Sequence, residues 1–387
     1  MRMAVATPLS TSGRFIVDKN GSRVRLAGVN WYGASEDMGV PAGLDRVDRN
    51  TLAALIAAQG FNSVRLPFSV WMTRQTAPVP QQALTANPDL FGKNPLEVFD
   101  ACVKALTDKG LIVIPNCHLL DFGWCCKEDD TNGLWFNDRF TTQNFTDTWT
   151  AIATRYKSNP LVAAMDIKNE PRSAVVGGKT LHPQWGTTGG PDIAPMYTEV
   201  GNAILHVDPQ VLIICEGLSF ASDLTGVKTH PIKLSQPNKV VYSMHDYHWF
   251  HTDGQQKQPA YTAAMNQKGG FILTGNIAPL WIGEFGRICA NPAPGTQGPQ
   301  PWWGNIMGWL AQADVDWCWW ALNPTHGKAS PPPGGSLSHA GGTPEPFGLL
   351  TQDWSAVGFP AIVNSLKQIM QPQSGPHIAV AHHALSS

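Results

Sequence analysis

The chain has 387 residues, of which 43% are hydrophobic and only 14% are charged, so it can build a large core and is not a disordered polyelectrolyte. Its 27 Lys and Arg residues against 29 Asp and Glu residues give a net charge of -2, with no basic surplus for nucleic-acid phosphates. The longest apolar runs fall far short of the roughly 20 residues that cross a bilayer. Neither nucleic acid nor a membrane is an expected partner.

The first predicted element is a β-hairpin over residues 13–26, with Asn20-Gly21 as the turn between two alternating runs. This hairpin is expected to cap one end of the core. After it, short apolar runs alternate with amphipathic stretches, the pattern of parallel βα units. The predicted strands are 26–30, 63–67, 111–116, 163–168, 211–215, 240–245, 280–284 and 316–321, and the predicted helices are 49–59, 95–109, 143–156, 194–207, 301–313 and 355–370.

Eight strands with helical returns predict an α/β fold, a closed (β/α)8 TIM barrel with long loops on its catalytic face. The expected division is one catalytic domain over residues 13–370 and a C-terminal tail over 371–387. An open doubly wound sheet is the structural alternative. It is disfavoured because Asn30-Trp31-Tyr32-Gly33 follows the first strand where a Gly-rich phosphate turn would stand.

Polar residues collect at the ends of the predicted strands, where a barrel of this kind carries its chemistry. Two carboxylates stand out, because Glu170 and Glu284 each close an apolar strand, and strands four and seven lie on opposite sides of a barrel mouth. A pair of carboxyl groups facing one cleft is what glycosidic cleavage requires. The chain also has 15 Trp residues; most are expected in the core, and the remainder are expected to line a cleft that binds sugar rings.

The ordered set of motifs resembles glycoside hydrolase family 5, the cellulase-like branch of the retaining (β/α)8 glycosidases. The resemblance covers residues 13–370 and rests on Gly28-Val29-Asn30-Trp31, Val64-Arg65-Leu66-Pro67, His118, Arg155-Tyr156-Lys157 with Asn159-Pro160, Asn169-Glu170-Pro171, His245-Asp246-Tyr247, Ile282-Gly283-Glu284-Phe285-Gly286 and Trp319-Trp320 before Asn323-Pro324. It implies a retaining hydrolase of β-linked glycosides that acts through a covalent glycosyl-enzyme.

The resemblance also implies roles for individual residues. Glu170 is expected to be the acid/base and Glu284 the nucleophile, with Asn169 bonded to the sugar 2-hydroxyl. The remaining expected substrate-binding and supporting residues are Arg65 and Tyr247, which would keep Glu284 ionised and oriented, His118 and His245, which would bind sugar hydroxyls, Trp320, which would stack beneath the ring being cleaved, and Trp31. No cofactor and no metal is expected.

The expected substrate is a β-glucan or a related β-glycoside, cleaved by an endoglucanase-like or β-glucosidase-like enzyme that is a monomer. The Gly-rich loop 173–192 and the insertion 328–346 depart from the commonest cellulase pattern and bear on the choice of sugar. Two other classes remain open. One is a metal-dependent barrel hydrolase, which the spacing of His245, His248 and His251 would suit; the other is a non-catalytic carbohydrate-binding protein.

The seven cysteines cannot all pair. Those within or beside core elements are expected to be free thiols; they are Cys102, Cys117, Cys215 and Cys318. We predict one disulfide that joins Cys289 to Cys125 or Cys126, with a vicinal Cys125-Cys126 bridge or three free thiols as alternatives. No signal peptide opens the chain. A secreted enzyme without its signal peptide is expected, and a cytoplasmic enzyme is the alternative.

Overall fold

Eight parallel strands close into a barrel at the centre of the computed structural model, which describes residues 5–126, 130–289, 300–326 and 343–372. In order around the barrel the strands are β3 (Ala27–Asn30), β4 (Ser63–Ser69), β5 (Ile112–Leu119), β6 (Ala164–Asp166), β9 (Leu212–Glu216), β10 (Val240–Asp246), β11 (Leu280–Phe285) and β12 (Asp316–Trp319). Almost every strand residue is buried, which explains the near-continuous apolar runs. The predicted (β/α)8 barrel is confirmed.

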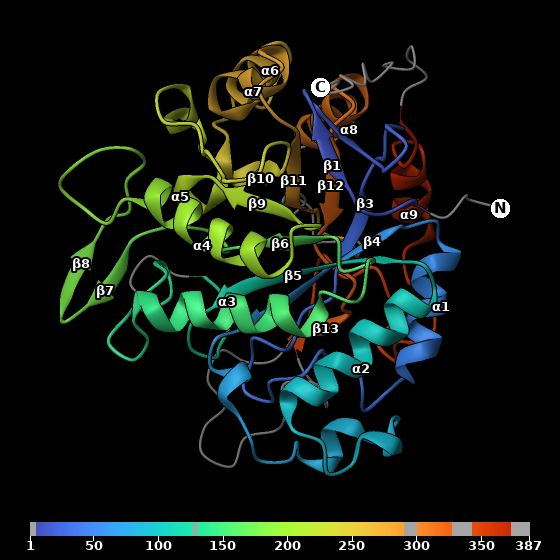
Figure 1. Cartoon of the computed structure of the whole chain (residues 1–387). Coiled ribbons are helices and arrows are strands. Elements are labelled where there is room, and N and C mark those ends of the chain that lie inside the picture. The colour runs from blue at the N-terminus through green and yellow to red at the C-terminus, as the bar shows by residue number, and fades with distance from the viewer. Residues whose placement is uncertain (1–4, 127–129, 290–299, 327–342, 373–387) are drawn as a thin grey trace, which may run out of the picture.

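Helices cover the outside of this barrel, as Figure 1 shows for α1 to α4. The six predicted helices correspond to α1 (Arg49–Ala58), α2 (Pro95–Asp108), α3 (Thr142–Tyr156), α4 (Ile193–Val207), α8 (Gln300–Gln312) and α9 (Pro360–Lys367). Their boundaries follow local chemistry: Asn94 and Glu97 form a reciprocal capping box at the start of α2, and Gly110 after its end has φ 75°. Helix α9 begins later than predicted, because Asp353 and Ser355 form a hydrogen-bonded turn and Pro360 opens the helix.

The N-terminal hairpin lies earlier in the chain than predicted. Strands β1 (Ser10–Ser12) and β2 (Phe15–Val17) pair across a turn at Gly13, whose φ is 52°. The Asn20-Gly21 segment forms a local loop instead, because the Asp18 carboxylate accepts hydrogen bonds from the backbone N–H groups of Asn20 and Ser22. The hairpin still caps the barrel, since its buried side chains join those of the lower barrel interior; the shared cluster includes Leu9, Ile16, Leu26, Ile112, Ile114, Leu212, Ile214 and Trp281.

Short elements complete the described chain. They are η1 (Met72–Arg74), η2 (Gln81–Leu84), η3 (Pro88–Leu90), β7 (Ala174–Val176), β8 (Lys179–Leu181), α5 (Leu218–Ala221), η4 (Thr225–Lys228), η5 (His248–Phe250), α6 (Ala260–Met265), η6 (Asn266–Gly270), α7 (Phe271–Thr274), β13 (Thr325–His326) and β14 (Thr343–Pro344). The β7–β8 hairpin extends away from the barrel (Figure 1). Its turn, Gly177-Gly178, has positive φ at both positions, which glycine adopts without strain.

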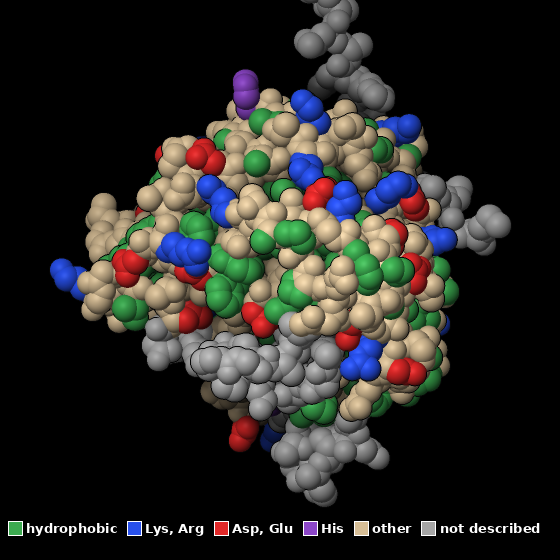
Figure 2. All heavy atoms as spheres, turned by 90° about the horizontal axis from the view of Figure 1, so that it is seen from below, with side chains coloured by type: hydrophobic (Ala, Val, Ile, Leu, Met, Phe, Trp, Pro, Cys, Tyr) green, Lys and Arg blue, Asp and Glu red, His purple; other side chains and the backbone are tan. Residues whose placement is uncertain are grey.

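The composition and the short apolar runs predict a surface without a basic patch and helices that do not cross a membrane. Figure 2 shows Lys and Arg interspersed with Asp and Glu on the face seen from below, without a basic patch. Among the described helices, none has the length and apolar character of a membrane span. Most of the predicted insertion 328–346 and of the tail 371–387 lies outside the described residues.

Candidate active site

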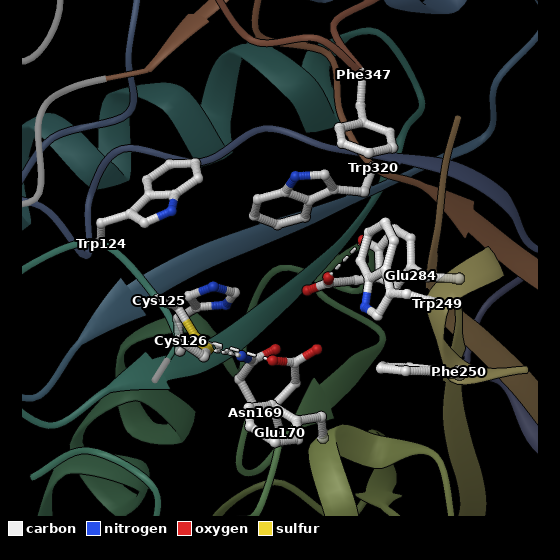
Figure 3. Close-up of a pocket in the computed structure, with 13 residues that line it drawn as sticks. Trp124, Cys125, Cys126, Asn169, Glu170, Trp249, Phe250, Glu284, Trp320 and Phe347 are labelled. Carbon is white, nitrogen blue, oxygen red and sulfur yellow. Dashed lines mark hydrogen bonds between the residues drawn. A yellow bond between two sulfur atoms is a disulfide. The ribbon is translucent and has the colours of Figure 1, made fainter. Parts of the chain in front are cut away.

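A cavity of about 600 Å³ opens at the C-terminal ends of the barrel strands. Its walls come from β5, from the segments after β5, β6, β9 and β10, from the ends of β11 and β12, and from Phe347 after β14 (Figure 3). The lining residues are His118, Trp124, Cys125, Cys126, Asn169, Glu170, Phe220, Tyr247, Trp249, Phe250, Glu284, Trp320 and Phe347. Six of the nine predicted site residues therefore reach one cavity from strand ends that are far apart in the sequence.

Glu170 lies in a tight turn just after β6. Its φ is 45°, a left-handed conformation that costs energy for a residue with a side chain. Every peptide group around it is bonded: Glu170 N–H donates to Glu216 at 2.7 Å, Lys168 Nζ donates to the Asn169 carbonyl at 2.7 Å, and Arg172 donates to the Glu170 carbonyl at 3.0 Å. These contacts hold the carboxyl group in the cavity.

Glu284 approaches from the opposite side, near the end of β11. Arg65 Nη1 donates to Glu284 Oε1 at 2.6 Å, and the Tyr247 hydroxyl donates to Oε2 at 3.0 Å. Arg65 comes from β4 and Tyr247 directly follows β10, so the barrel itself sets the orientation of the carboxylate. Both donors predicted to orient Glu284 are in contact with it.

The two carboxyl groups face one another across a short gap (Figure 3). One oxygen of Glu170, one oxygen of Glu284 and one nitrogen of His245 all lie within 4.8 Å of one another. His245 Nδ1 is 2.9 Å from Glu170 Oε1 and 3.6 Å from Glu284 Oε2. A reacting atom placed above this gap can be reached by both carboxyl groups.

Arg65 is the centre of the buried polar network under the cavity. All five of its N–H donors are used; the acceptors are Asp166, Asn30, Glu284, Asn169 and Glu216, at 2.6 to 2.9 Å. Burial disfavours the charged guanidinium, but the three carboxylates outweigh burial and raise the pKa of Arg65. Arg65, Asp166 and Glu216 are fully buried, so their ion pairs are shielded from water, whereas Glu284 is also buried but reaches the cavity surface.

Two carboxylates of this network, Asp166 and Glu216, were not among the predicted site residues. Glu216 directly follows the apolar run 211–215, so the rule that singled out Glu170 and Glu284 at strand ends would also have found it. Burial, followed by the charge of Asp166, raises the pKa of Glu216 well above its ordinary value. Glu216 accepts hydrogen bonds from both Arg65 and the Glu170 N–H, so it ties the Glu170 turn to the buried network.

The electrostatics of the two facing carboxyl groups differ. Burial raises the pKa of Glu170 to about 7, against the opposing charges of Arg172, Arg65 and Lys168. Burial also raises the pKa of Glu284, where the neighbouring Arg65 charge opposes the effect. Burial lowers the pKa of His245 to about 4, so this imidazole is neutral near pH 7. A pKa of about 7 leaves a large fraction of Glu170 protonated near neutral pH, a property that suits a general acid.

Aromatic rings form most of the remaining cavity wall. Trp320 lines the cavity and stacks on Tyr32 with ring centroids 4.9 Å apart and an interplanar angle of 5°. Trp249, another lining residue, stacks on Tyr247 with ring centroids 4.4 Å apart and is 54% exposed. Five of the lining aromatic residues were not predicted individually, because they lie on segments outside the barrel strands: Trp124, Phe220, Trp249, Phe250 and Phe347. In the sequence, the high number of Trp residues was the one indication that further aromatic side chains would line the cavity.

Two predicted sugar-contacting residues lie away from the cavity surface. Trp31 is fully buried in the core, where its indole N–H donates to the Ala42 carbonyl at 2.9 Å. His245 is also fully buried and touches the two carboxyl groups from beneath. His251 bonds to Asp246 at 2.6 Å, and neither His248 nor His251 belongs to a group of converging ligand atoms among the described residues. The geometry therefore does not assemble the three-histidine metal site.

The predicted pairing of Cys289 is wrong. Cys125 and Cys126 form a disulfide with one another, which was the vicinal alternative, and Cys289 is a free thiol that contacts the carbonyl oxygens of Arg287 and Phe347. The reason is distance around the rim: Cys289 follows β11, whereas the Cys125-Cys126 loop follows β5 and bends over Asn169. Cys102, Cys117, Cys215 and Cys318 are free and buried, as predicted.

Comparison with known proteins gives a consistent result. A family model described as "Cellulase (glycosyl hydrolase family 5)" matches residues 17–326. A glycosyl hydrolase 5 family protein of Chamaecyparis obtusa is 31% identical over 96% of this chain and 67% of the relative. An endoglucanase of Paenibacillus polymyxa is 28% identical over 94% of this chain and 87% of the relative.

Solved structures show the same architecture. The structure of a hyperthermophilic endocellulase from the archaeon Pyrococcus horikoshii aligns with a TM-score of 0.76 at 24% identity, over 95% of this chain and 100% of that one. The catalytic domain of the major endoglucanase from Xanthomonas campestris pv. campestris aligns with a TM-score of 0.75 at 22% identity, over 94% and 99%. At these identities the alignments establish the shared fold.

Proposed function

Because the chain belongs to glycoside hydrolase family 5, we propose that it is an endo-acting β-glucanase in which Glu170 is the acid/base and Glu284 is the nucleophile. The observation that carries the proposal is the short gap between the two carboxyl groups. One oxygen of Glu170 lies within 4.8 Å of one oxygen of Glu284. Retaining glycosidases place these groups about 5 to 5.5 Å apart, whereas inverting enzymes need about 6.5 to 9.5 Å to admit a water. The gap favours double displacement.

In the first step, a Glu284 oxygen attacks the anomeric carbon while Glu170 donates its proton to the departing glycosidic oxygen. The bond to the leaving sugar breaks, and an ester bond between Glu284 and the glycosyl unit forms. In the second step, Glu170 takes a proton from a water molecule, and the water oxygen displaces Glu284 from the anomeric carbon. The products are two sugars with a proton returned to Glu170, so the enzyme is regenerated.

The residues around Glu284 and Glu170 favour the charge that each carboxyl group needs in the two steps. Arg65 and Tyr247 donate to Glu284, which stabilises the carboxylate that attacks and that leaves again. Once Glu284 is esterified its negative charge is gone. The pKa of Glu170 then falls, because a like charge nearby has been removed. Glu170 is thereby suited to be an acid in the first step and a base in the second.

Substrate choice is inferred from the relatives and from the shape of the cavity. The curated relatives include endoglucanases, and flat sugar faces fit the aromatic walls formed by Trp320 and Trp249. A second cavity of about 350 Å³ adjoins the first, and Phe220 lines both. Space beyond Glu170 suits a chain that continues past the bond being cleaved, as endo action requires.

The oligomeric state and the location of the enzyme are also part of the proposal. We infer a monomer with one catalytic domain over residues 13–370, because the eight strands of a single chain close the barrel and carry both facing carboxyl groups. A relative described as the major extracellular endoglucanase of Xanthomonas campestris is 30% identical over 89% of this chain and 68% of its own length. This supports secretion of the present enzyme.

The function is tested with a panel of soluble β-glucans, mannans and xylans. Endo action on a β-glucan lowers viscosity long before many reducing ends accumulate, so the plot of fluidity against reducing ends should be steep. The Glu284→Gln variant serves as the control for contaminating hydrolases. Release of a single terminal sugar or disaccharide with unchanged viscosity would refute endo action, and hydrolysis of mannan or xylan alone would refute the glucan assignment.

We predict that Glu170→Ala loses activity according to the leaving group. An acid is needed only when the departing oxygen is a poor leaving group, so kcat/KM should fall by about 10³-fold on cellooligosaccharides and far less on a dinitrophenyl β-glycoside. Added azide should restore turnover of the activated substrate and yield a β-glycosyl azide, because azide attacks the glycosyl-enzyme on the open β face. Equal losses on both substrates would contradict the acid role.

The pH dependence should follow the raised pKa of Glu170, which is about 7. The protonated form is the active acid and its fraction falls as the pH rises, so kcat/KM on cellooligosaccharides should decline above about pH 7. A dinitrophenyl glycoside needs no protonation, so its decline should be much weaker. Measurements from pH 4 to 9 decide this. Activity on cellooligosaccharides that stays constant through pH 9 would contradict a proton held by Glu170.

A further inference from the structure

The disulfide between Cys125 and Cys126 lies in the wall of the candidate active site. Both residues are half-buried and line the cavity beside Asn169 and Glu170. Figure 3 shows the two sulfur atoms over the Asn169 side chain, with the amide nitrogen directed at them. Asn169 Nδ2 is 3.4 Å from Cys125 Sγ and 3.7 Å from Cys126 Sγ, and Glu170 Oε2 is 3.9 Å from Cys125 Sγ.

Asn169 is held from two directions. On the barrel side, its Oδ1 accepts a hydrogen bond from Arg65 Nη2 at 2.7 Å. This bond fixes which end of the amide is the oxygen and turns the NH₂ group towards the cavity and the sulfur atoms. On the cavity side, the NH₂ group contacts the two sulfur atoms at 3.4 and 3.7 Å. The disulfide is therefore the outer support of the amide.

The chemistry of a disulfide suits this position. Its sulfur atoms accept weakly and carry no proton, so they can face the Asn169 N–H groups without repelling them. Two thiols would each bring an S–H donor to the same place. A thiol of Cys125 would then have the Glu170 carboxyl within reach as an acceptor, and the two side chains would turn independently. The oxidised pair thus keeps the polar surface opposite the sugar in one arrangement.

We propose that the Cys125–Cys126 disulfide is a positioning element of the active site, one that holds the Asn169 amide against the 2-hydroxyl of the sugar being cleaved. The inference rests on the proposed function, because it assigns Asn169 to that hydroxyl. It adds a requirement: full activity depends on the oxidised state of this pair. The five other cysteines are free thiols, so mild reduction changes only this bond.

The test compares an aryl β-cellobioside with its analogue that lacks the 2-hydroxyl on the sugar being cleaved. In the double variant Cys125→Ala/Cys126→Ala, kcat/KM on the parent glycoside should fall roughly tenfold. The reason is that a misplaced Asn169 amide no longer stabilises the transition state through the 2-hydroxyl. On the 2-deoxy analogue the loss should be about twofold or less, since the contact is already missing.

Cys289→Ala is the matched control, because Cys289 is a half-buried free cysteine that follows a barrel strand and does not line the cavity. It should leave both substrates unaffected. A merely structural disulfide would lower stability, or lower kcat/KM equally on both glycosides. Equal losses on the two substrates would therefore overturn the proposal.

Reduction provides a second arm that needs no variant to fold. A water-soluble phosphine attacks one sulfur and breaks the S–S bond; water then supplies the oxygen of the phosphine oxide and the protons of two thiols. The reduced wild type should match the double variant on both substrates, and the double variant should not respond. Seven free thiols in the denatured, unreduced enzyme would overturn the proposal. So would full activity of the reduced wild type while Glu284→Gln is inactive, a result that leaves the proposed function intact.

Discussion

The Glu284→Gln variant is expected to lose kcat on β-glucan by about 10⁴-fold or more, as enzymes do when a catalytic nucleophile is removed. The amide keeps the shape of the side chain and its contact with Tyr247, but it cannot form the glycosyl ester. Binding of a cellooligosaccharide, measured by calorimetry, should change only a few-fold. A variant that retains a tenth of wild-type turnover would show that Glu284 is not the nucleophile.

Azide distinguishes the two carboxyl groups in matched variants. In Glu284→Gly, azide fills the space left by the side chain and attacks the α face of an activated β-glycoside, so the product should be an α-glycosyl azide. In Glu170→Ala, the product should be the β-glycosyl azide, because Glu284 has already formed the intermediate. A β-glycosyl azide from Glu284→Gly together with an α-glycosyl azide from Glu170→Ala would mean that Glu170 is the nucleophile and Glu284 the acid/base.

Arg65→Met is expected to destabilise the fold by about 3 to 5 kcal/mol, the usual consequence of removing one partner from a buried ion pair. Three buried carboxylates, Asp166, Glu216 and Glu284, lose their common donor. Denaturant unfolding measures the change. Arg46→Met is the control, because Arg46 is 45% exposed in its pair with Asp45, where the loss should be under about 1 kcal/mol.

The deficit of Arg65→Met should also depend on pH. A buried carboxyl group whose folded pKa lies above its unfolded value destabilises the fold at high pH, and the penalty disappears as the pH falls below the unfolded pKa. Burial already raises the pKa of Glu216 and Glu284, and loss of Arg65 raises both further. The stability difference from wild type should therefore be smaller at pH 5 than at pH 8. If the stability difference between wild type and Arg65→Met stayed constant or grew on acidification, buried unpaired carboxylates would not be its cause.

Most of the fold could be predicted from the sequence, because parallel barrel strands are buried on both faces and leave short apolar runs at regular intervals. Helix boundaries followed from local chemistry, as at Asn94 and Gly110. The errors arose where two local turns competed. Near the N-terminus, Gly13 forms the hairpin turn while Asp18 holds Asn20-Gly21 in a loop of its own, and the sequence favoured the second turn over the first.

The candidate site was predictable where barrel topology alone brings residues together. Glu170 and Glu284 close strands, so their convergence follows from the fold. His245 was placed at the cavity surface because a strand end does not reveal that the side chain lies beneath the carboxyl groups. The loop aromatics and the Cys125–Cys126 pairing depend on loop paths, which long-range packing decides and which no local pattern records.

The most direct test of the account is the anomeric configuration of the first product. Proton NMR follows hydrolysis of a β-linked cellooligosaccharide by the wild type, before mutarotation equilibrates the anomers. Two displacements, at Glu284 and then by water activated by Glu170, predict that the β-anomer appears first and that the α-anomer grows in later. Initial formation of the α-anomer would mean a single displacement by water and would contradict the assignment of both carboxyl groups.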